Sequence, residues 1–291
     1  MDSFSGKIAI ITGGGSGMGR ELARRLSAEG CHLALCDVGE EGLAETKRQC
    51  EAPAPAGTTI SLHRCDVTDE ADVLAFRDAA LAAHGTDHVH LVFNNAGIGG
   101  GGSFLQDRRE DWDRVFAVCW SGVYFGTRAF LPLLVAAPEG HLDNTSSSNG
   151  FWAALGPKRA HTAYCAAKFA VKGFTEALIT DLRLHAPHVK VSVVMPGHIG
   201  TDIAANSAAV LGQGAHPKLD AASGRFRESA PTTAAAAAGI ILDGVRAGRW
   251  RILVGEDAQL LDQFVREAPE EAYETGFTDR MREHDVLSYI L

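Results

Sequence analysis

The sequence has little of what several protein classes need. Its 27 Lys and Arg residues are outnumbered by 36 Asp and Glu residues, and the formal net charge is −9. The basic residues also form no stripe, so the chain repels a phosphate backbone and we expect no nucleic-acid partner. The six cysteines are scattered, with no Cys-x-x-Cys pair among them. In a chain of 291 residues this pattern indicates reduced thiols in a cytosolic protein.

Long hydrophobic runs are also missing. We see no apolar stretch that approaches the roughly 20 residues needed to cross a bilayer. The first apolar strand begins almost at once, at Lys7–Thr12, which leaves no room for a signal peptide before it. We therefore expect a soluble, cytoplasmic protein with no membrane partner.

Short apolar runs instead alternate with longer segments of helical period along the chain. The expected strands are Ile8–Thr12, His32–Cys36, Ile60–Arg64, Leu91–Asn94, Leu142–Ser146, Val189–Val194 and Arg251–Val254. The expected helices are Met18–Glu29, Gly39–Glu51, Glu70–His84, Arg109–Ala136, Ala163–His185 and Thr232–Ala247. This alternation predicts an α/β fold, a doubly wound (Rossmann) parallel sheet of about seven strands flanked by helices.

No linker divides the chain, so we expect a single domain over residues 1–291. Residues 204–231 have weak periodicity and several Gly residues, which is typical of a mobile substrate flap with a broken helix. Residues 257–291 form a charged C-terminal extension of helical period that ends in the apolar segment Val286–Leu291. Since an exposed apolar end is costly, we expect the extension to dock on another subunit.

A glycine-rich turn follows the first strand and precedes the first helix. It reads Thr12-Gly13-Gly14-Gly15-Ser16-Gly17-Met18-Gly19. The first of its spaced glycines (Gly13) permits a sharp turn, the second (Gly17) lets the backbone approach a pyrophosphate, and the third (Gly19) packs helix on strand. A helix N-terminus also attracts anions. Glycine-rich strings alone often form plain flexible loops, but this context favours a dinucleotide site.

Asp37 ends the second strand, 18 residues after Gly19. A carboxylate there can accept hydrogen bonds from both hydroxyls of the adenosine ribose, and it would repel a 2′-phosphate. No Arg or Lys directly follows it. The position favours NAD(H) over NADP(H), although a strand-end Asp can also cap the next helix.

Three further strings lie at strand ends or at a helix start. They are Asn94-Asn95-Ala96-Gly97, Ser146-Ser147-Ser148 and Tyr164-Cys165-Ala166-Ala167-Lys168. With the glycine turn, they resemble the short-chain dehydrogenase/reductase family, the branch with TGxxxGxG and YxxxK. The resemblance extends from Lys7 to about Gly255 and implies an NAD(H)-dependent oxidoreductase that interconverts a secondary alcohol and a ketone.

The chemistry of the Tyr–Lys pair supports this interpretation. Tyr164 and Lys168 are four residues apart, so they share one face of a helix. A phenol of pKa about 10 is a poor base at neutral pH. A nearby ammonium and a cationic nicotinamide lower that pKa, so Tyr164 can act as general acid and base. Ser147 would hydrogen-bond the substrate oxygen and stabilise its developing charge. On their own, such residues are more often a surface pair and a helix cap.

The resemblance also implies a set of cofactor-binding residues. The element from Pro196 to Thr201 would lie over the nicotinamide, Asp66 and Val67 would contact the adenine, and Asn94 would border the cofactor and support the sheet. The full expected set is Gly13, Ser16, Gly17, Met18, Gly19, Asp37, Val38, Asp66, Val67, Asn94, Ala96, Gly97, Tyr164, Lys168, Pro196, Gly197, Ile199 and Thr201. We expect no metal.

Three features depart from the family pattern. The family usually has a catalytic Asn in V-N-x-x-G-V, where this chain has Cys119, a residue that would hold a proton-relay water poorly. Ser147 and Tyr164 are 17 residues apart, about four more than usual, so the loop Phe151–His161 could bulge outward. Ser148 stays a possible alternative to Ser147. Asp143 occupies an expected buried strand, where it would need a partner or a local distortion.

The substrate is expected to be lipophilic, such as a cyclic alcohol, terpenoid or steroid. Five residues could line an apolar pocket, namely Trp152, Leu155, Ile203, Val210 and Leu211. The family resemblance implies a homo-oligomer, a tetramer or dimer, assembled through the helices 109–136 and 163–185. Two alternatives stay open: an NAD(H)-binding sensor with weak or no turnover, and an epimerase or dehydratase of the same fold.

Overall fold

A seven-stranded sheet forms the centre of the molecule. The computed structural model describes residues 1–156, 159–213 and 217–287. Every neighbouring pair of strands in the sheet is parallel, as predicted. The strand order is β3 (Ile60–Arg64), β2 (His32–Asp37), β1 (Ile8–Thr12), β4 (Leu91–Asn94), β5 (Gly140–Thr145), β6 (Val189–Pro196) and β9 (Arg251–Val254). The reversal of order beside β1 places a crevice at the carboxyl ends of β1 and β4.

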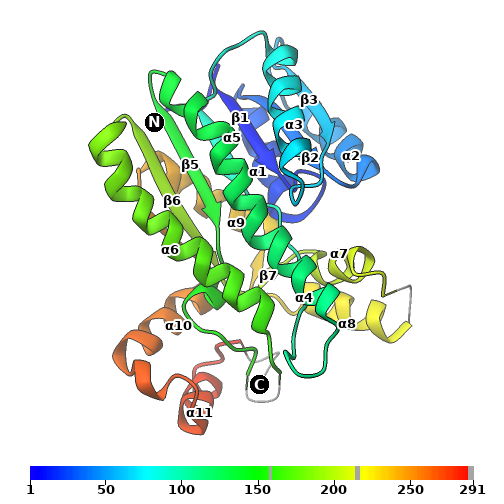
Figure 1. The fold of residues 1–291 in the computed structure, drawn as a ribbon, viewed down its shortest axis with the longest axis vertical. Coiled ribbons are helices and arrows are strands. Elements are labelled where there is room, and N and C mark those ends of the chain that lie inside the picture. Colours follow the sequence, from blue (N-terminus) through cyan, green and yellow to red (C-terminus); the bar gives the residue numbers. More distant parts are fainter. Residues whose placement is uncertain (157–158, 214–216, 288–291) are drawn as a thin grey trace.

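Helices cover both faces of the sheet, which buries its apolar strands on both sides. One face is covered by α3 (Glu70–His84), α5 (Gly122–Ala136) and α6 (Thr162–His185). Figure 1 shows α5 and α6 crossing the same face. The other face is covered by α1 (Gly17–Ala28), α2 (Glu40–Glu51) and α9 (Ala234–Arg246). Ile10 packs toward the first set and Ile11 toward the second, as strand alternation requires. The predicted fold class is confirmed.

The predicted helix 109–136 is continuous but contains a widened turn. It consists of α4 (Arg109–Phe116), a π-helical turn over Ala117–Ser121, and α5. By length and composition this 28-residue helix could cross a membrane, in contrast to the sequence-based expectation. Half of its apolar window is buried inside the fold, as in the core helix of a compact domain.

Two pairs of helices lie beyond the carboxyl ends of the strands. The expected flap forms α7 (Ile203–Val210) and α8 (Pro217–Glu228), with residues 214–216 outside the described part. The C-terminal extension forms α10 (Glu256–Glu267) and α11 (Thr275–Glu283). Figure 1 shows both pairs at the lower end of the view. Two short parallel strands, β7 (Ile199–Gly200) before α7 and β8 (Thr232–Thr233) after α8, pair with each other and so join the two ends of the flap.

The described part of the C-terminal extension packs on its own chain. Val286 and Leu287, which we expected to dock on another subunit, are 1% and 7% exposed in this chain. They share an apolar cluster with Trp152, Phe264 and Met281. These contacts already cover the two side chains, so they need no second subunit for burial. Residues 288–291, the rest of the predicted apolar end, lie outside the described residues.

Candidate active site

The glycine turn after β1 forms one end of a cavity of about 460 Å³. Gly13 and Gly17 have φ angles of +67° and +52°, which favour glycine. A Cβ on Gly19 would lie 2.1 Å from the carbonyl oxygen of Gly13. Gly19 therefore lets α1 pack against the turn and lines neither of the two cavities described here. Gly13, Gly15, Ser16, Gly17 and Met18 of the turn line the cavity.

Asp37, at the end of β2, lines the same cavity beside the glycine turn. Its carboxylate accepts hydrogen bonds from the backbone N–H of Gly15 (3.0 Å) and of Gly39 (3.1 Å). Gly39 is the residue before α2, and no side chain caps that helix. Arg114, a basic side chain among the described lining residues, is paired with Asp66 at 2.8 Å. No described Lys or Arg therefore pairs with Asp37.

The loop after β4 connects this cavity to a second one. Thr12 Oγ1 accepts hydrogen bonds from the backbone N–H groups of Asn95 (3.0 Å) and Ala96 (3.1 Å), which holds the loop against β1. Asn94 Nδ2 donates to Asn144 Oδ1 at 2.8 Å inside the sheet. Asn94 thus supports the sheet, as expected, but it does not line the described cavities.

The second cavity, of about 350 Å³, contains the three predicted catalytic residues. Ser147, Tyr164 and Lys168 all line it. The two cavities share five lining residues, Met18, Asn95, Gly97, Thr201 and Ile203. Of the other expected cofactor residues, Gly13, Ser16, Gly17, Asp37, Val38, Asp66, Val67 and Ala96 line the first cavity, and Pro196, Gly197 and Ile199 line the second. The structure thus brings the expected catalytic and cofactor-binding residues, except Gly19, Asn94 and Cys119, to two cavities that share lining residues.

Lys168 is buried under the loop that carries the serines. Its Nζ donates to the carbonyl oxygen of Thr145 (2.8 Å) and lies 5.5 Å from the centre of the Tyr164 ring. Burial lowers the pKa of Lys168. The first turn of α6 presents Tyr164, and the next turn places Lys168 beneath it. The ammonium is therefore close enough to favour a phenolate electrostatically.

All three serines after β5 line the second cavity. Ser146 Oγ donates to the carbonyl oxygen of Lys168 (2.7 Å), and Ser147 Oγ accepts from the N–H of Asn149 (3.1 Å). The strand ends at Thr145, one residue before its predicted end. The alternation of side-chain directions along the strand therefore stops before the serines. It does not turn Ser148 away from the cavity, which Ser148 lines together with Ser147.

Cys119 lies within the π-helical turn, close to Lys168. Its thiol donates to the carbonyl oxygen of Ile98 at 3.2 Å. A Cβ on Gly97 would lie 3.5 Å from Lys168 Nζ and 3.9 Å from Cys119 Sγ. The thiol and the ammonium thus approach the same stretch of backbone, where the family pattern has an amide side chain.

Asp143 meets neither of the two expectations for it. β5 keeps an unbroken register with β4 and β6, so the strand is not distorted. Asp143 is 1% exposed, and its Oδ2 has no hydrogen-bond partner among the described residues. Burial raises the pKa of this carboxyl well above its usual value. The raised pKa favours the neutral acid, which reduces the need for a charged partner.

The structure adds residues that the sequence did not identify. The ring of His161 stacks on that of Tyr164, with centres 4.6 Å apart, and burial lowers its pKa to about 4. Its position one turn before Tyr164 could have signalled this contact. Phe226 and Leu287 also line the second cavity, although no nearby motif marks them.

The expected apolar lining is partly correct. Leu155, Ile203 and Leu211 line the second cavity, and Val210 lines the first. Trp152 lines neither. It packs under the C-terminal extension instead, because its indole N–H donates to the carbonyl oxygen of Ala272 (2.8 Å).

Comparisons with known proteins agree with this arrangement. The sequence profile of the short chain dehydrogenase family matches residues 7–211. SadH of Mycobacterium tuberculosis, named an oxidoreductase, is 41% identical over 91% of this chain and 92% of its own. LinX of Sphingobium indicum, a 2,5-dichloro-2,5-cyclohexadiene-1,4-diol dehydrogenase, is 33% identical over 70% of this chain and 77% of its own.

Solved structures of relatives have the same fold. A short chain dehydrogenase/reductase from Burkholderia phymatum, in complex with NAD, is 34% identical with a TM-score of 0.81. The match covers 93% of this chain and 96% of the other. A metagenomic short-chain oxidoreductase in complex with NADP is also 34% identical, with a TM-score of 0.59 over 73% of this chain and 93% of its own. The chain therefore belongs to the short-chain dehydrogenase family of oxidoreductases.

Proposed function

We propose that the protein is an NAD(H)-dependent oxidoreductase that interconverts a secondary alcohol and a ketone, with Tyr164 as general acid and base. The observation that carries this proposal is the placement of Ser147, Tyr164 and Lys168 in one cavity. That cavity shares lining residues with the cleft at the glycine turn. A dinucleotide on the turn would place its reactive end beside the phenol.

The residues of the first cavity fit a dinucleotide. The turn at Gly13 and Gly17 exposes backbone at the N-terminus of α1, where a pyrophosphate is stabilised. Asp37 can accept hydrogen bonds from two ribose hydroxyls, and no described Lys or Arg forms an ion pair with its carboxylate, whose charge would repel a 2′-phosphate. These features support NAD(H) over NADP(H).

The residues of the second cavity can move a proton to and from a carbonyl oxygen. In oxidation, Tyr164 takes the proton of the alcohol, since the Lys168 ammonium favours the phenolate. Bound NAD would supply the acceptor for the hydride of the carbinol carbon. Ser147 donates a hydrogen bond to the substrate oxygen, and Lys168 also binds the nicotinamide ribose. In reduction, Tyr164 returns the proton to the oxygen.

The lining supports a lipophilic substrate. Apolar side chains from three segments face the catalytic groups, among them Leu155, Leu211 and Phe226. LinX is named for a cyclic diol, and a human relative, 34% identical over 68% of this chain, is named epidermal retinol dehydrogenase 2. A ring-containing secondary alcohol or ketone fits both the lining and these names.

The proposal is tested with a panel of cyclic ketones and NADH or NADPH. We expect NADH oxidation with at least one ketone and a lower rate with NADPH. The variant Tyr164→Phe should lose about 100-fold or more of kcat while it still binds NADH. Full activity in that variant would overturn the catalytic role of Tyr164. NADH binding without turnover of any ketone would favour a sensor, a result that Cys119 at the Asn position would help to explain.

We also infer a cytoplasmic homo-oligomer assembled through α4, α5 and α6. Val135 on α5 and Phe169 on α6 are each 41% exposed, so apolar surface remains on these helices. All six cysteines are free, which suits a reducing compartment. Light scattering on the purified protein should give a dimer or tetramer mass, and a monomer at micromolar concentration would contradict the inference.

A further inference from the structure

We propose that the C-terminal extension supplies a wall of the substrate cavity within its own chain, and that Leu287 determines which substrates fit. This inference rests on the proposed function, because it concerns the apolar part of the same substrate. Leu287 lines the second cavity together with Tyr164 and Ser147, although more than 120 residues separate them in sequence.

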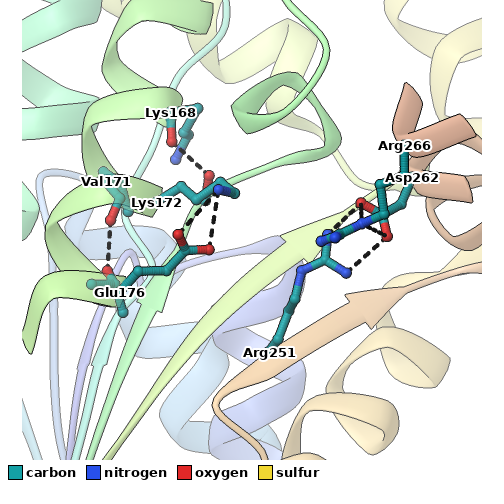
Figure 2. A network of polar contacts seen from close by, with 9 residues as sticks. Lys168, Val171, Lys172, Glu176, Arg251, Asp262 and Arg266 are labelled. Atoms are coloured by element: carbon teal, nitrogen blue, oxygen red, sulfur yellow. Dashed lines mark hydrogen bonds and ion pairs between the residues drawn. The ribbon is translucent and has the colours of Figure 1, made fainter. Parts of the chain in front are cut away.

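The extension is fixed to the edge of the sheet where it begins. Asp262 of α10 accepts hydrogen bonds from Arg251 of β9 (2.8 Å) and from Arg266 of its own helix (3.0 Å). Figure 2 shows this carboxylate between the two guanidinium groups. Asp257, in the first turn of α10, accepts from the backbone N–H of His198, in the loop after β6 that borders the cavity. α10 is thus attached both to the last strand and to the loop beside the site.

The middle of the extension is attached to the long loop between Ser147 and Tyr164. The indole N–H of Trp152 donates to the carbonyl oxygen of Ala272 (2.8 Å), and the N–H of Ala153 donates to the hydroxyl of Tyr273 (3.1 Å). Trp152 also packs against Phe277, with ring centres 6.0 Å apart. The loop that is longer than the family pattern therefore serves as the platform on which the extension rests.

The chain then turns so that Leu287 reaches the cavity. Asp285 and Leu287 have φ angles of +54° and +53°, a conformation that is uncommon for residues other than glycine. Such backbone persists where surrounding contacts hold it, and it often marks a functional position. Leu287 is 7% exposed and belongs both to the apolar cluster of the extension and to the cavity lining.

Val286 provides a matched control from the same turn. It is 1% exposed in the same apolar cluster, but it does not line the cavity. A change at Val286 should therefore affect the packing of the extension alone. A change at Leu287 should also alter the shape of the space beside the phenol.

The expected substrate has an apolar ring system beyond its reacting carbon. Leu287, Leu155, Leu211 and Phe226 line the cavity with apolar side chains, and the catalytic polar groups are Ser147, Tyr164 and Lys168. Ser207 and Gln213 add polar side chains to the same lining. A carbonyl bound at the polar end would direct its hydrocarbon part toward this apolar wall. Substrate size should then be limited by the side chain at position 287.

The experiment compares 2-decalone with cyclohexanone, using NADH and the full chain. For Leu287→Ala we expect the ratio of kcat/KM, bicyclic over monocyclic, to rise about tenfold, the range that one or two methylenes give in an apolar pocket. Leu287→Phe should lower the ratio, and Val286→Ala should leave it within about twofold of wild type. An unchanged ratio in both Leu287 variants, or an equal change in Val286→Ala, would overturn the inference.

A binding measurement separates this inference from the proposed function. If the wild-type protein reduces no ketone, the proposed function fails, and the wall is tested through the dissociation constant of 2-decalone from the NADH complex. A calorimetric titration should show a change of about fivefold or more in Leu287→Phe, with Val286→Ala unchanged. Equal affinities in wild type and Leu287→Phe would overturn the inference even without catalysis.

Discussion

The cofactor side and the substrate side of the crevice are built in different ways. The cofactor side consists of backbone turns at the ends of β1, β2 and β4, supported by short-range contacts such as the hydrogen bonds from Gly15 and Gly39 to Asp37. The substrate side combines the flap, the loop after β5 and the C-terminal extension, and the last two share an apolar cluster around Trp152. The proposed cofactor site is thus built on the sheet itself, whereas the proposed substrate site is built largely from segments outside the sheet.

The largest expected effect tests whether the substrate side of the crevice is separate from the sheet. Met281→Ala removes a fully buried side chain from the cluster of the extension and should cost about 2–5 kcal/mol of local stability. We expect a higher KM for the ketone and an NADH dissociation constant within about twofold of wild type. Enzyme kinetics and NADH fluorescence titration measure the two quantities.

Leu33→Ala is the control on the other side of the comparison. Leu33 is fully buried in the core beneath α1 and α2. Its loss should lower the melting temperature without a selective effect on the ketone KM. If Met281→Ala and Leu33→Ala weaken NADH binding and ketone binding alike, the two regions form one unit.

Asp37→Ala probes the cofactor side alone. Loss of the carboxylate should weaken NADH binding about tenfold, or about 1.4 kcal/mol, and should narrow the preference over NADPH. The matched control is Glu41→Ala, which removes a carboxylate that lines the same cavity from α2. Fluorescence titrations with both cofactors should distinguish the variants. Equal effects of the two substitutions would show that NADH binding depends on the net charge of the cavity and not on the position of the Asp37 carboxylate.

Asp143→Asn should stabilise the protein at neutral pH. The folded-state pKa of Asp143 is raised above the usual 3.8, so above that pH the unfolded state gains charge while the folded state stays neutral. Stability is therefore lost as pH rises from 3.8 toward the folded pKa. Each pKa unit of the shift costs about 1.4 kcal/mol.

Melting curves of wild type and Asp143→Asn from pH 3 to pH 8 measure this effect. We expect a higher melting temperature for the variant at pH 7, by about 2–4 °C for each kcal/mol, and no difference below about pH 3.8. A lower melting temperature of the variant at pH 7 would mean that a charged, paired carboxylate stabilises the folded protein.

Cys119→Asn has the smallest expected effect. An amide can hold a relay water that a thiol holds poorly, so we expect kcat to rise by about threefold and its pH dependence to change. Cys165→Ala, at a buried thiol on α6 that does not line the cavities, is the control. Unchanged turnover across pH in Cys119→Asn would assign that thiol to the core alone.

The difference between the cofactor side and the substrate side also explains which features the sequence could predict. The positions of the strands, the glycine turn and the Tyr–Lys pair follow from local signals, because each depends on residues that are close in the sequence. Four strands match their predicted bounds, at Ile8–Thr12, Ile60–Arg64, Leu91–Asn94 and Arg251–Val254. β6 runs on to Pro196, and α9 starts two residues late because Thr232 and Thr233 form β8.

The substrate side of the crevice could not be predicted in this way. Trp152 and Leu287 acquire their roles from contacts between segments that are distant in sequence, so no local period or motif marks these roles. The raised pKa of Asp143 likewise depends on tertiary burial rather than on its neighbours in the chain. Local patterns predict where backbone turns and helix faces lie, whereas packing across the crevice must be seen in three dimensions.

The most direct test of a single crevice that joins the two sides is hydride transfer followed by isotope. Wild-type protein is incubated with a cyclic ketone and NADH that carries deuterium at the transferring position of the nicotinamide, and the product alcohol is analysed by mass spectrometry. The account predicts one deuterium at the carbinol carbon with wild type, and none with Tyr164→Phe that still binds the cofactor. A wild-type protein that binds the deuterated cofactor and the ketone but forms no labelled alcohol would contradict this account.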